Sequence, residues 1–396
     1  MNMVIHNLLG NLDIYPVLID IGAAGSSPTI WDSIAKDSIY IGFDPNLKEP
    51  RDISQEKYFR SITINKAVTN DRKNKNVLFN VTQSPYCSSI LKPDLDSLMN
   101  FIFLDLFVVK ERKEVETIAL DTVLNHFSLK KIDWLKTDSQ GIDLRVFNSI
   151  ADPIRSHILA LDMEPGFINA YQGEDLFIDI HKDLTNQGFW LSDMNVCGTV
   201  RMQKSTLTKA QKICHSIDID FVKAKFRKTP CWSEIRYLRT LNYMAQNKFG
   251  KREYILLWIF SILDAQYGFA LDIIFEYKKL FGEDGIWQKM KSETLFNVKR
   301  LETLPISEGM MVAIFGSGEK GKFLYDHCKK NNIQVACFID NDSSKWGKKV
   351  DNIEIVSPEN IDEIAKRIDC IVIASQWERE IYYQIKGMNS KNIYLY

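Results

Sequence analysis

Two stretches of the sequence place a glycine-containing loop between a short apolar strand and a helical segment. The first is VLIDIGAAGSS, residues 17–27, and the second is VAIFGSGEKG, residues 312–321, near the other end of the chain. Such a loop is typical of α/β folds that bind nucleotide-like ligands at the carboxyl ends of parallel strands. The sequence therefore predicts two α/β units, each with one loop of this kind.

The first unit has the alternation of strands and helices that a mostly parallel sheet requires. The expected buried strands are residues 17–21, 39–43, 62–68, 132–136 and 158–163. Residues 76–120 alternate less cleanly, and NVLFNVTQ followed by CSSIL is interpreted as an inserted hairpin and loop over the rim of the sheet.

Capping residues mark the expected helices of this unit. We expect Ser27 to cap a helix that starts at Pro28, and Asp121 to cap the helix TVLNHF. Gly188 is expected to end a helix in a left-handed conformation, before the strand FWLSDM.

The sequence predicts three parts. Residues 1–228 form an α/β domain, residues 229–304 form a helical connector with few turn residues, and residues 305–396 form a smaller Rossmann-like α/β domain. The aromatic residues of the connector are at helical spacing, which favours a core over a ligand site, with a homodimer face as the alternative.

Composition and charge narrow the function classes. The 396 residues have a net charge of -1, which does not favour nucleic acid, and the basic run Lys223–Lys228 is interpreted as solvated surface. Seven scattered cysteines show neither C-x-x-C nor zinc-ligand spacing. The N-terminus lacks signal-peptide features, and the most apolar stretch, Tyr254–Leu263, is about half a membrane span. We therefore expect a cytoplasmic protein without a transmembrane segment.

The residues around the first loop indicate its ligand. Gly22 and Gly25 suit a tight turn, and Asp44, at the end of the next strand, is placed to accept the hydroxyls of a ribose. Asp20 lies in the strand immediately before the turn, where a carboxylate would repel a pyrophosphate and attract a cationic group. The sequence therefore predicts S-adenosylmethionine rather than a dinucleotide.

Four motifs, LIDIGAAG, YIGFDPN, NKAVTN and IDWLKTDSQGID, resemble the successive motifs of FkbM-type class I methyltransferases, over about residues 17–203. The late signature of that family usually has a Glu-Gly pair, whereas this chain has Gln140 and Gly141. The resemblance implies a class I methyltransferase Rossmann-like sheet and an O-methyltransferase that acts on a hydroxyl, commonly of a sugar or a secondary metabolite. The cofactor-binding residues expected here are Asp20, Gly22, Ala23, Gly25, Asp44, Ala67 and Asp138.

Two carboxylates are the candidates for catalysis. Asp138 and Glu164 each follow a strand of the expected sheet, so both should reach the same crevice, one as the base and one as the residue that orients the acceptor. The alternative is that each caps a helix or binds the cofactor. Asp162 could join them as ligands of a magnesium ion, but it should point opposite to a neighbour along its strand, so we expect no metal.

Other polar residues are weaker candidates. The histidines His126, His157 and His181 are interpreted as structural. The inserted loop carries three residues that either contact the cofactor or acceptor or are solvated, namely Tyr86, Ser88 and Ser89.

The second loop has a complete G-x-G-x-x-G pattern, formed by Gly316, Gly318 and Gly321. Asp340 closes the following strand, which favours NAD over its phosphorylated form, whereas Glu319 in the loop opposes a phosphate. This region resembles the small Rossmann-like domain attached to bacterial sugar-modifying enzymes, which implies a nucleotide sugar or no ligand, while the glycine pattern keeps NAD as an alternative. A dehydrogenase-like pair, Tyr382 and Lys386, falls in a terminal helix, so binding is favoured over catalysis there.

Three function classes remain. The leading one is an S-adenosylmethionine-dependent O-methyltransferase that modifies a sugar or a precursor of a capsule, lipopolysaccharide or related glycan. The second is an NAD-dependent nucleotide-sugar oxidoreductase or epimerase centred on the C-terminal loop. The third is a binding module without catalysis.

Overall fold

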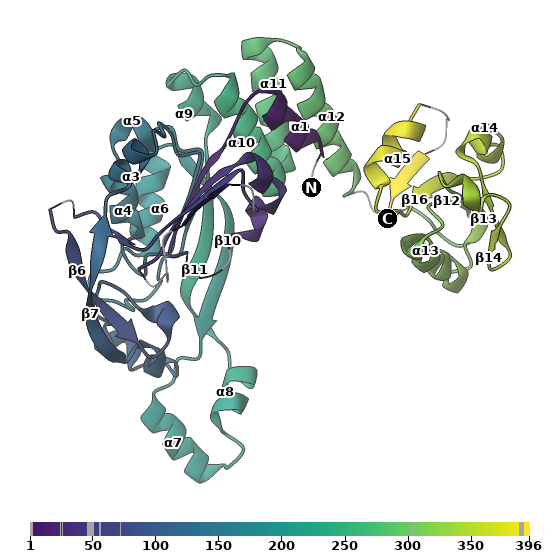
Figure 1. Cartoon of the computed structure of the whole chain (residues 1–396). Helices are drawn as coiled ribbons and strands as arrows, with labels where there is room; N and C mark the ends of the chain where they lie inside the picture. Colours follow the sequence, from purple (N-terminus) through teal and green to yellow (C-terminus); the bar gives the residue numbers. More distant parts are fainter. Residues whose placement is uncertain are drawn as a thin grey trace. The chain divides into compact units, whose positions relative to one another are not determined.

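The structure of this chain is a computed structural model that describes residues 3–23, 25, 27–45, 51–54, 57–71, 73–301, 304–387 and 392–396. It divides into two compact units, Met1–Trp287 and Gln288–Tyr396. Each unit is an α/β structure with its own sheet (Figure 1). The predicted fold class is therefore confirmed.

An eight-stranded sheet forms the centre of the first unit. Its strands are β1 (Val17–Ile21), β2 (Ile39–Phe43), β3 (Arg51–Ser54), β4 (Arg60–Ile64), β8 (Trp134–Thr137), β9 (Ala160–Met163), β10 (Phe189–Thr199) and β11 (Thr229–Arg239). Their order in space is β10-β11-β9-β8-β1-β2-β4-β3. The strands from β9 to β4 are parallel, while β11 runs antiparallel to β9 and β10. The loops after the parallel strands therefore meet at one edge of the sheet.

Helices cover both faces of this sheet (Figure 1). The elements concerned are α3 (Leu120–His126), α4 (Asp143–Ser149) and α6 (Phe177–Asn186) on one face, and α10 (Lys251–Leu263) on the other. The helices α3, α4 and α6 pack against alternate residues of β1, namely Val17, Ile19 and Ile21, in one hydrophobic core. On the other face, the rings of Trp134 and Phe260 are 4.8 Å apart. Since side chains along a strand alternate, Asp20 points to the α10 face.

The remaining elements of the first unit include a second, three-stranded sheet of order β5-β7-β6. Its strands are β5 (Ala67–Val68), β6 (Asn76–Thr82) and β7 (Val109–Ile118). The other helices are α1 (Met3–Asn11), α2 (Leu95–Leu98), α5 (Asp152–Arg155), α9 (Leu241–Gln246) and α11 (Tyr267–Phe281), with short 3₁₀ turns at η1 (Thr29–Ser33), η2 (Ala35–Asp37), η3 (Pro85–Cys87) and η4 (Leu104–Phe107).

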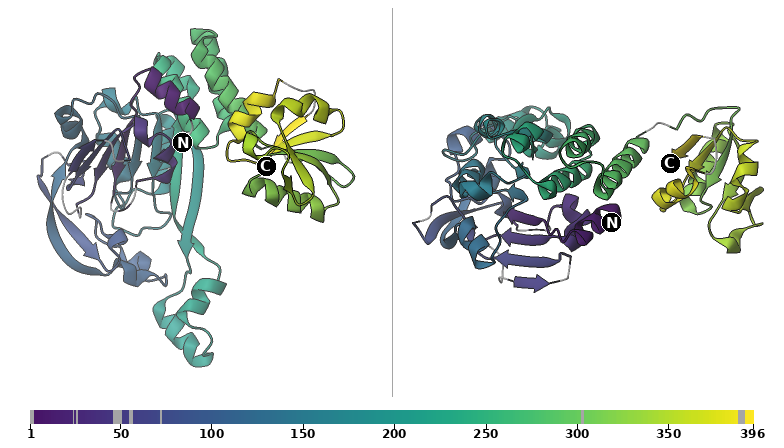
Figure 2. Two further views of the ribbon diagram at one scale, coloured as in Figure 1. Left: turned by 45° about the vertical axis from the view of Figure 1, so that its right-hand side comes forward. Right: turned by 90° about the horizontal axis from the view of Figure 1, so that it is seen from above.

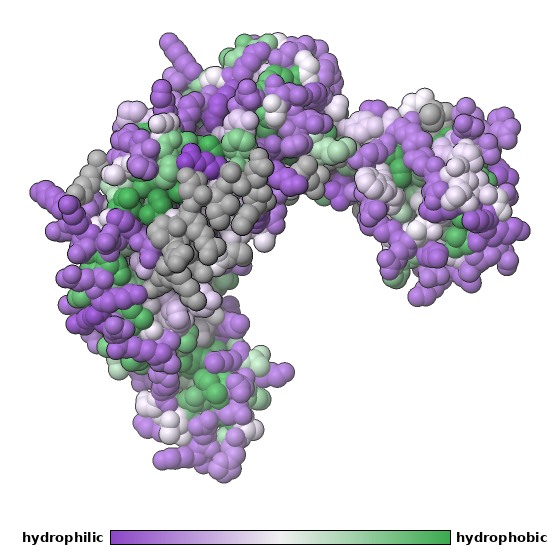
Figure 3. All heavy atoms as spheres, in the orientation of Figure 1, coloured by the Kyte–Doolittle hydropathy of each residue, from purple (hydrophilic) through white to green (hydrophobic). Residues whose placement is uncertain are grey.

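Two helices lie between β10 and β11, and we call residues 200–228 the helical arm. The arm consists of α7 (Lys204–Ile213), α8 (Ile219–Lys225) and their connections. It projects from the ends of the two strands, away from the sheet (Figure 2). On the face shown in Figure 3, hydrophobic residues lie among hydrophilic ones over the arm.

The second unit has a six-stranded sheet of order β14-β15-β13-β12-β16-β17. Its elements are β12 (Met311–Phe315), α13 (Glu319–Lys330), β13 (Gln334–Ile339), η5 (Ser343–Lys345), β14 (Lys349–Val350), β15 (Ile353–Val356), η6 (Pro358–Asn360), α14 (Ile361–Ala365), β16 (Cys370–Ile373), α15 (Glu378–Ile385) and β17 (Asn392–Leu395). A long helix, α12 (Gly285–Lys299), contributes Phe296 to one core of this unit.

Several expected elements differ in the structure. Residues 229–239, expected as the start of a helical connector, form β11 because their buried side chains alternate and pair with both β9 and β10. The helix expected after Pro28 is replaced by the two short turns η1 and η2, and no side chain caps the first. Ser27 instead accepts a hydrogen bond from Lys57 Nζ at 2.9 Å.

Two further expectations are corrected. Asp121 lies inside α3 rather than at its cap, and its Oδ1 accepts from the backbone N–H of Ala151 at 3.3 Å. The strand 76–82 pairs along its length with β7 rather than with CSSIL, which contributes a single bridge from Ser89 to Asn80. Gly188, by contrast, has a φ of 82° just after Gln187, the C-cap residue of α6, so it ends that helix in a left-handed conformation as predicted.

Candidate functional site

The loops after β1, β2 and β8 lie side by side at the rim of the main sheet. The backbone N–H groups of Gly22 and Ala23 donate to the carbonyl of Phe43 at 2.9 and 3.0 Å. The N–H of Asp138 donates to Ile21 at 2.9 Å. These bonds bring the predicted cofactor residues of β1 next to the ends of β2 and β8. Asp44, which follows β2, is buried at the same rim.

The two glycines of the first loop have different environments. Gly22 has a φ of +87°, and a Cβ added there would lie 2.4 Å from the carbonyl oxygen of Asp138. A Cβ at Gly25 would meet nothing within 4 Å. The protein itself therefore requires a glycine at Gly22, whereas Gly25 borders open space.

Asp20 is not a free carboxylate. It is 1% exposed, its Oδ1 is 2.9 Å from Lys136 Nζ, and its Oδ2 accepts from Tyr40 at 3.1 Å. Burial alone would lower the pKa of Lys136, but the carboxylates of Asp20 and Asp138 outweigh it and raise that pKa. The expected repulsion between Asp20 and a phosphate is therefore offset by a neighbouring cation.

Asp20 belongs to a row of alternating charges across the sheet. Strand pairing places it opposite Lys136, Lys136 opposite Asp162, and Asp162 opposite Arg236. Arg236 donates to Asp162 through Nε at 2.7 Å and Nη2 at 3.2 Å. We name these four side chains the charge row.

The charge row argues against the alternative in which Asp162 joins Asp138 and Glu164 as a magnesium ligand. Because Arg236 holds Asp162, that carboxylate is engaged with a cation on the α10 face instead of completing a ligand set with Asp138 and Glu164. Among the described residues, no group of three or more histidine, cysteine, aspartate or glutamate side chains has the arrangement of a metal site.

Asp138 and Glu164 form a half-buried carboxyl pair joined by a hydrogen bond. Burial, and then the charge of Asp138, raises the pKa of Glu164 to about 9. Burial also raises the pKa of Asp138, although the Lys136 cation opposes that shift. Because the cation favours the ionised form of Asp138, the proton that the pair holds at neutral pH lies on Glu164.

Gln140 and Tyr171 complete this arrangement, and the sequence did not single them out as functional. Gln140 Nε2 donates to Asp138 Oδ1 at 2.5 Å, and Gln140 Oε1 accepts from the Tyr171 hydroxyl at 2.8 Å. Gln140 has a φ of 55°, in the left-handed region. The amide can donate to an ionised Asp138, which an ionised glutamate at the same position could not do.

Two cavities meet at Glu164, which lines both. The aromatic cavity has a volume of about 260 Å³ and mostly apolar walls, including Phe103, Phe107, Tyr171 and Trp232. The charged cavity has a volume of about 320 Å³ and is lined by the side chains of Lys136, Asp138, Asp162, Glu164 and Arg236 among others. The carboxyl pair therefore stands where a polar space meets an apolar one.

The three candidate residues of the inserted loop have different environments. Tyr86 lines the aromatic cavity and is 80% exposed. Ser88 and Ser89 are buried; the Ser88 hydroxyl accepts from Thr82, and the Ser89 hydroxyl donates to the carbonyl of Gln140 at 2.7 Å. The two serines therefore support the loops around the cavity.

The remaining candidate residues, Ala67 and the three histidines, are not part of the carboxyl pair. Ala67, in β5, packs its methyl group among Phe79 and Val115 of the small sheet. The histidines have local partners: His126 packs on Phe127, His157 bonds the carbonyl of Pro153, and His181 bonds Tyr237. These contacts agree with a structural role for the histidines.

Residues 20–191 match the family model of the methyltransferase FkbM domain. The first unit contains an FkbM methyltransferase domain. The match runs from the end of β1 to the start of β10, and so includes both glycines of the loop and the carboxyl pair. No curated protein matches the chain.

Outside the FkbM domain, residues 309–393 match the model described as C2185-like, N-terminal. Three solved structures are similar to parts of the chain, each with a TM-score of 0.20. They are UDP-D-quinovosamine 4-dehydrogenase from Vibrio fischeri (21% identity, 21% of this chain and 75% of that chain), the Rex-family repressor RSP (15%, 39% and 72%) and RSP in complex with β-NADH (16%, 39% and 72%). At these scores the structural matches support no conclusion about ligands.

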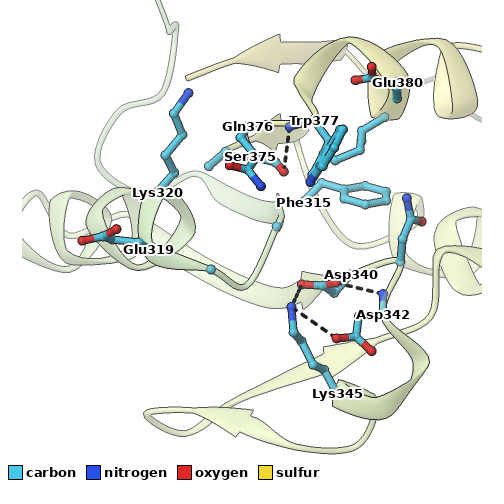
Figure 4. Close-up of a pocket in the computed structure, with 15 residues that line it drawn as sticks. Phe315, Glu319, Lys320, Asp340, Asp342, Lys345, Ser375, Gln376, Trp377 and Glu380 are labelled. Atoms are coloured by element: carbon cyan, nitrogen blue, oxygen red, sulfur yellow. Dashed lines mark hydrogen bonds and ion pairs between the residues drawn. The ribbon is translucent and has the colours of Figure 1, made fainter.

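A third cavity, of about 690 Å³, lies at the glycine loop of the second unit (Figure 4). We call it the C-terminal cavity. Gly316 has a φ of +113°, and a Cβ there would lie 2.5 Å from the carbonyl oxygen of Ala374. A Cβ at Gly318 would meet nothing within 4 Å, so this part of the loop borders open space. Gly321 packs against the carbonyl of Gly316 at the start of α13.

Asp340 already has donors around its carboxylate. Its Oδ2 accepts from the Ser317 hydroxyl at 2.5 Å. The same oxygen lies 3.1 Å from Lys345 Nζ, and Asp340 Oδ1 accepts from the N–H of Asp342 (Figure 4). Burial alone would raise the pKa of Asp340, but these donors outweigh it and lower the pKa. A ribose at this site would share Asp340 with Lys345.

The dehydrogenase-like pair does not line the C-terminal cavity. Tyr382 packs on Phe296 and Tyr383, and Lys386 lies over the ring of Tyr383 at 4.1 Å. Trp377, which is 59% exposed, does line the cavity (Figure 4). The geometry thus offers a flat aromatic surface there, with no Tyr-Lys pair for hydride transfer.

Proposed function

We propose that the FkbM domain is an S-adenosylmethionine-dependent O-methyltransferase that acts on a hydroxyl of a sugar or glycan precursor. The observation that supports this most is the half-buried Asp138–Glu164 pair at the rim beside the Gly22 loop. A carboxylate kept ionised by Lys136 next to a protonated acid can take a proton from one hydroxyl while a second group orients it.

The cofactor fits the first loop on steric grounds. The turn at Gly22 is held against the backbone of Asp138, and the open space at Gly25 leaves room for a ligand to approach the backbone. When bound, S-adenosylmethionine supplies an activated methyl group for in-line transfer to the acceptor oxygen. Asp44, Gly22, Ala23 and Gly25 are the residues proposed to hold it.

The proposed roles in the reaction follow from the contacts. Asp138 accepts the proton of the acceptor hydroxyl, and Gln140 orients Asp138 through its 2.5 Å hydrogen bond. Glu164, protonated at neutral pH, donates its proton to Asp138, and its other carboxyl oxygen, at the border of the two cavities, accepts a hydrogen bond from a neighbouring hydroxyl of the acceptor. The aromatic walls, among them Trp232 and Tyr171, suit the apolar face of a sugar ring.

Binding and transfer of a labelled methyl group test this proposal. We expect S-adenosylhomocysteine to bind the full chain and Asp44→Ala to weaken that binding at least tenfold. Asp138→Asn should keep the binding, while methyl transfer to a glycan or nucleotide-sugar fraction falls about 10²-fold or more. Unchanged transfer by Asp138→Asn would contradict the role of Asp138, and binding of NAD in place of S-adenosylhomocysteine would contradict the cofactor. Transfer that survives a chelator is expected, because no metal is proposed.

A second proposal concerns the C-terminal unit. The C-terminal cavity, with open space at Gly318 and an exposed Trp377, supports binding of NAD or a nucleotide sugar. Because the Tyr382–Lys386 pair lies outside the cavity, we propose binding rather than oxidoreduction. Titration with NAD and with uridine diphosphate sugars tests this, with Gly318→Val expected to block either ligand. Turnover of a nucleotide sugar with NAD would instead support the oxidoreductase alternative.

A further inference from the structure

The helical arm has a charge opposite to that of the rest of the chain. Residues 200–228 contain eight lysines and arginines against two aspartates, a net charge of +6, while the whole chain has a net charge of -1. The basic residues are Arg201, Lys204, Lys209, Lys212, Lys223, Lys225, Arg227 and Lys228, and all eight are exposed. Positive charge is thus concentrated on one projecting element (Figure 2).

Most of this charge has no internal partner. Lys204 pairs with Asp105, and Arg201 lies over the ring of Phe101 at 5.4 Å. The other six basic side chains form no ion pair with any residue that the structure describes. Their charge is therefore available to an external anion.

The arm also exposes apolar side chains beside these cations. Ile213, which follows Lys212, is 87% exposed, and Phe221 and Phe226 are each 40% exposed. They are not needed for the small core of the arm, which consists of Leu207, Val222 and neighbouring residues packed on Ile102. Exposure of an isoleucine to this extent beside lysines is unfavourable in water and favourable at a lipid interface.

We propose that the helical arm docks on a bilayer surface that contains anionic lipids. The lysines and arginines supply attraction to the headgroups, and Ile213, Phe221 and Phe226 enter the interface between headgroups and acyl chains. The helices have 10 and 7 residues, too few to cross a bilayer, and no helix among the described residues is long and apolar enough to do so. The contact is therefore peripheral.

A lipid surface accounts for the arm better than a nucleic acid does. The phosphates of a nucleic acid would attract the same cations, but they offer nothing to an exposed isoleucine. Interfacial lipid helices combine a basic surface with aliphatic and aromatic side chains, as this arm does. The two kinds of partner can also be distinguished by experiment. A change of the exposed apolar residues alone should weaken binding to lipid and leave binding to a polyanion unchanged.

Flotation of the full chain with lipid vesicles tests the proposal. We expect binding to vesicles of phosphatidylcholine with about one third phosphatidylglycerol, and little binding to phosphatidylcholine alone. The variant K223Q/K225Q/R227Q/K228Q is expected to weaken partition by a factor of about 100 or more, since each such residue near an anionic surface contributes about fivefold. Ile213→Ser is expected to weaken it about fivefold or more while leaving heparin binding unchanged.

A matched variant controls for total charge. K322Q/K330Q/K348Q/K349Q removes four exposed lysines from the second unit and should leave vesicle binding unchanged. All substituted side chains are exposed, so the variants are expected to keep the wild-type melting temperature. Binding to heparin or RNA without binding to anionic vesicles would overturn the proposal in favour of a polyanion, and an equal loss in the control variant would overturn the assignment to the arm. Absence of vesicle binding at physiological salt would also overturn it.

Discussion

Gly22 and Gly25 illustrate how two identical residues of one loop serve different purposes. Gly22 is constrained by a positive φ and by the carbonyl of Asp138, whereas Gly25 has space around it. The sequence predicted a tight turn at both positions. It could not distinguish them, because the constraint on Gly22 comes from a strand that lies more than a hundred residues later in the chain.

This difference gives a matched pair of substitutions. Gly22→Ala should lower the free energy of unfolding by about 2 kcal/mol or more, because the backbone conformation and the 2.4 Å contact both oppose a Cβ. Gly25→Ala should leave the melting temperature within about 2 °C and weaken S-adenosylhomocysteine, because only a ligand would meet the added methyl group. Calorimetry of melting and of binding checks both. A stable Gly25→Ala variant with unchanged affinity would exclude ligand contact at that position.

The protonated state of Glu164 predicts a pH dependence of stability. The native side chain keeps its proton up to about pH 9, whereas the carboxyl of the unfolded chain ionises near its usual value of 4.5. Between these values the native state holds a proton that the unfolded state has released. The free energy of unfolding therefore falls as pH rises, by at most about 1.4 kcal/mol per pH unit.

Glu164→Gln should remove this dependence. We expect the melting temperature of the wild type to fall more steeply between pH 6 and pH 8.5 than that of the variant. Glu111→Gln, at an exposed position of β7, is the control and should follow the wild type. Equal slopes for the wild type and Glu164→Gln would mean that Glu164 ionises normally.

Pairing across the sheet explains why other site residues were hidden from sequence analysis. Lys136 meets Asp20 across 116 residues of chain, and Arg236 meets Asp162 across 74. The residue types alone suggested a free Asp20 and offered Asp162 as a magnesium ligand only in an alternative that the sequence did not favour. Only the register of neighbouring strands shows that each has a cation beside it.

At the scale of elements, β11 shows where sequence periodicity was misread. Its buried residues, Cys231, Ser233, Ile235 and Tyr237, alternate as a strand requires, but the helices that follow continue the apolar pattern without a clear turn. The parallel strands β1, β2, β8 and β9 were predictable because each is a short apolar run next to a loop. An antiparallel strand inserted between two others has no such signal.

An ion pair between a buried carboxylate and a partly exposed guanidinium connects α10 to the sheet. Asp133, 1% exposed, accepts from Arg252 Nη1 and Nη2 at 2.7 and 2.8 Å and from the N–H of Val17 at 2.8 Å. It therefore links the start of β1 to the helix on its face. The pair is not evident from the sequence, because its partners are 119 residues apart.

Breaking this pair should be costly. Asp133→Asn should lower the free energy of unfolding by about 3 kcal/mol, because the Arg252 guanidinium loses its nearer counter-charge and keeps only Glu253, whose Oε1 is 3.5 Å away. Arg252→Met should also destabilise the chain, and the double variant should lose less than the sum of the two single variants. The exposed pair Asp152–Arg155 is the control, where Asp152→Asn should change stability by less than about 0.5 kcal/mol. Strict additivity in denaturant unfolding would contradict direct coupling.

At the scale of the whole molecule, each unit has its own hydrophobic core. Independent cores predict two calorimetric transitions. Saturation with S-adenosylhomocysteine at about 100 times its dissociation constant should stabilise only the unit that binds it, by about 2.7 kcal/mol. A single transition that moves as a whole would show that the units unfold cooperatively.

The charge row has a consequence for how the chain reaches its native pairing. In the native register, opposite charges lie side by side on β1, β8, β9 and β11. A strand that slipped by two residues would keep its apolar side chains on the correct faces but leave an uncompensated ion among its neighbours. Hydrophobic contacts alone would tolerate such an error. The four ions therefore favour the native register over a register shifted by two residues while the sheet assembles.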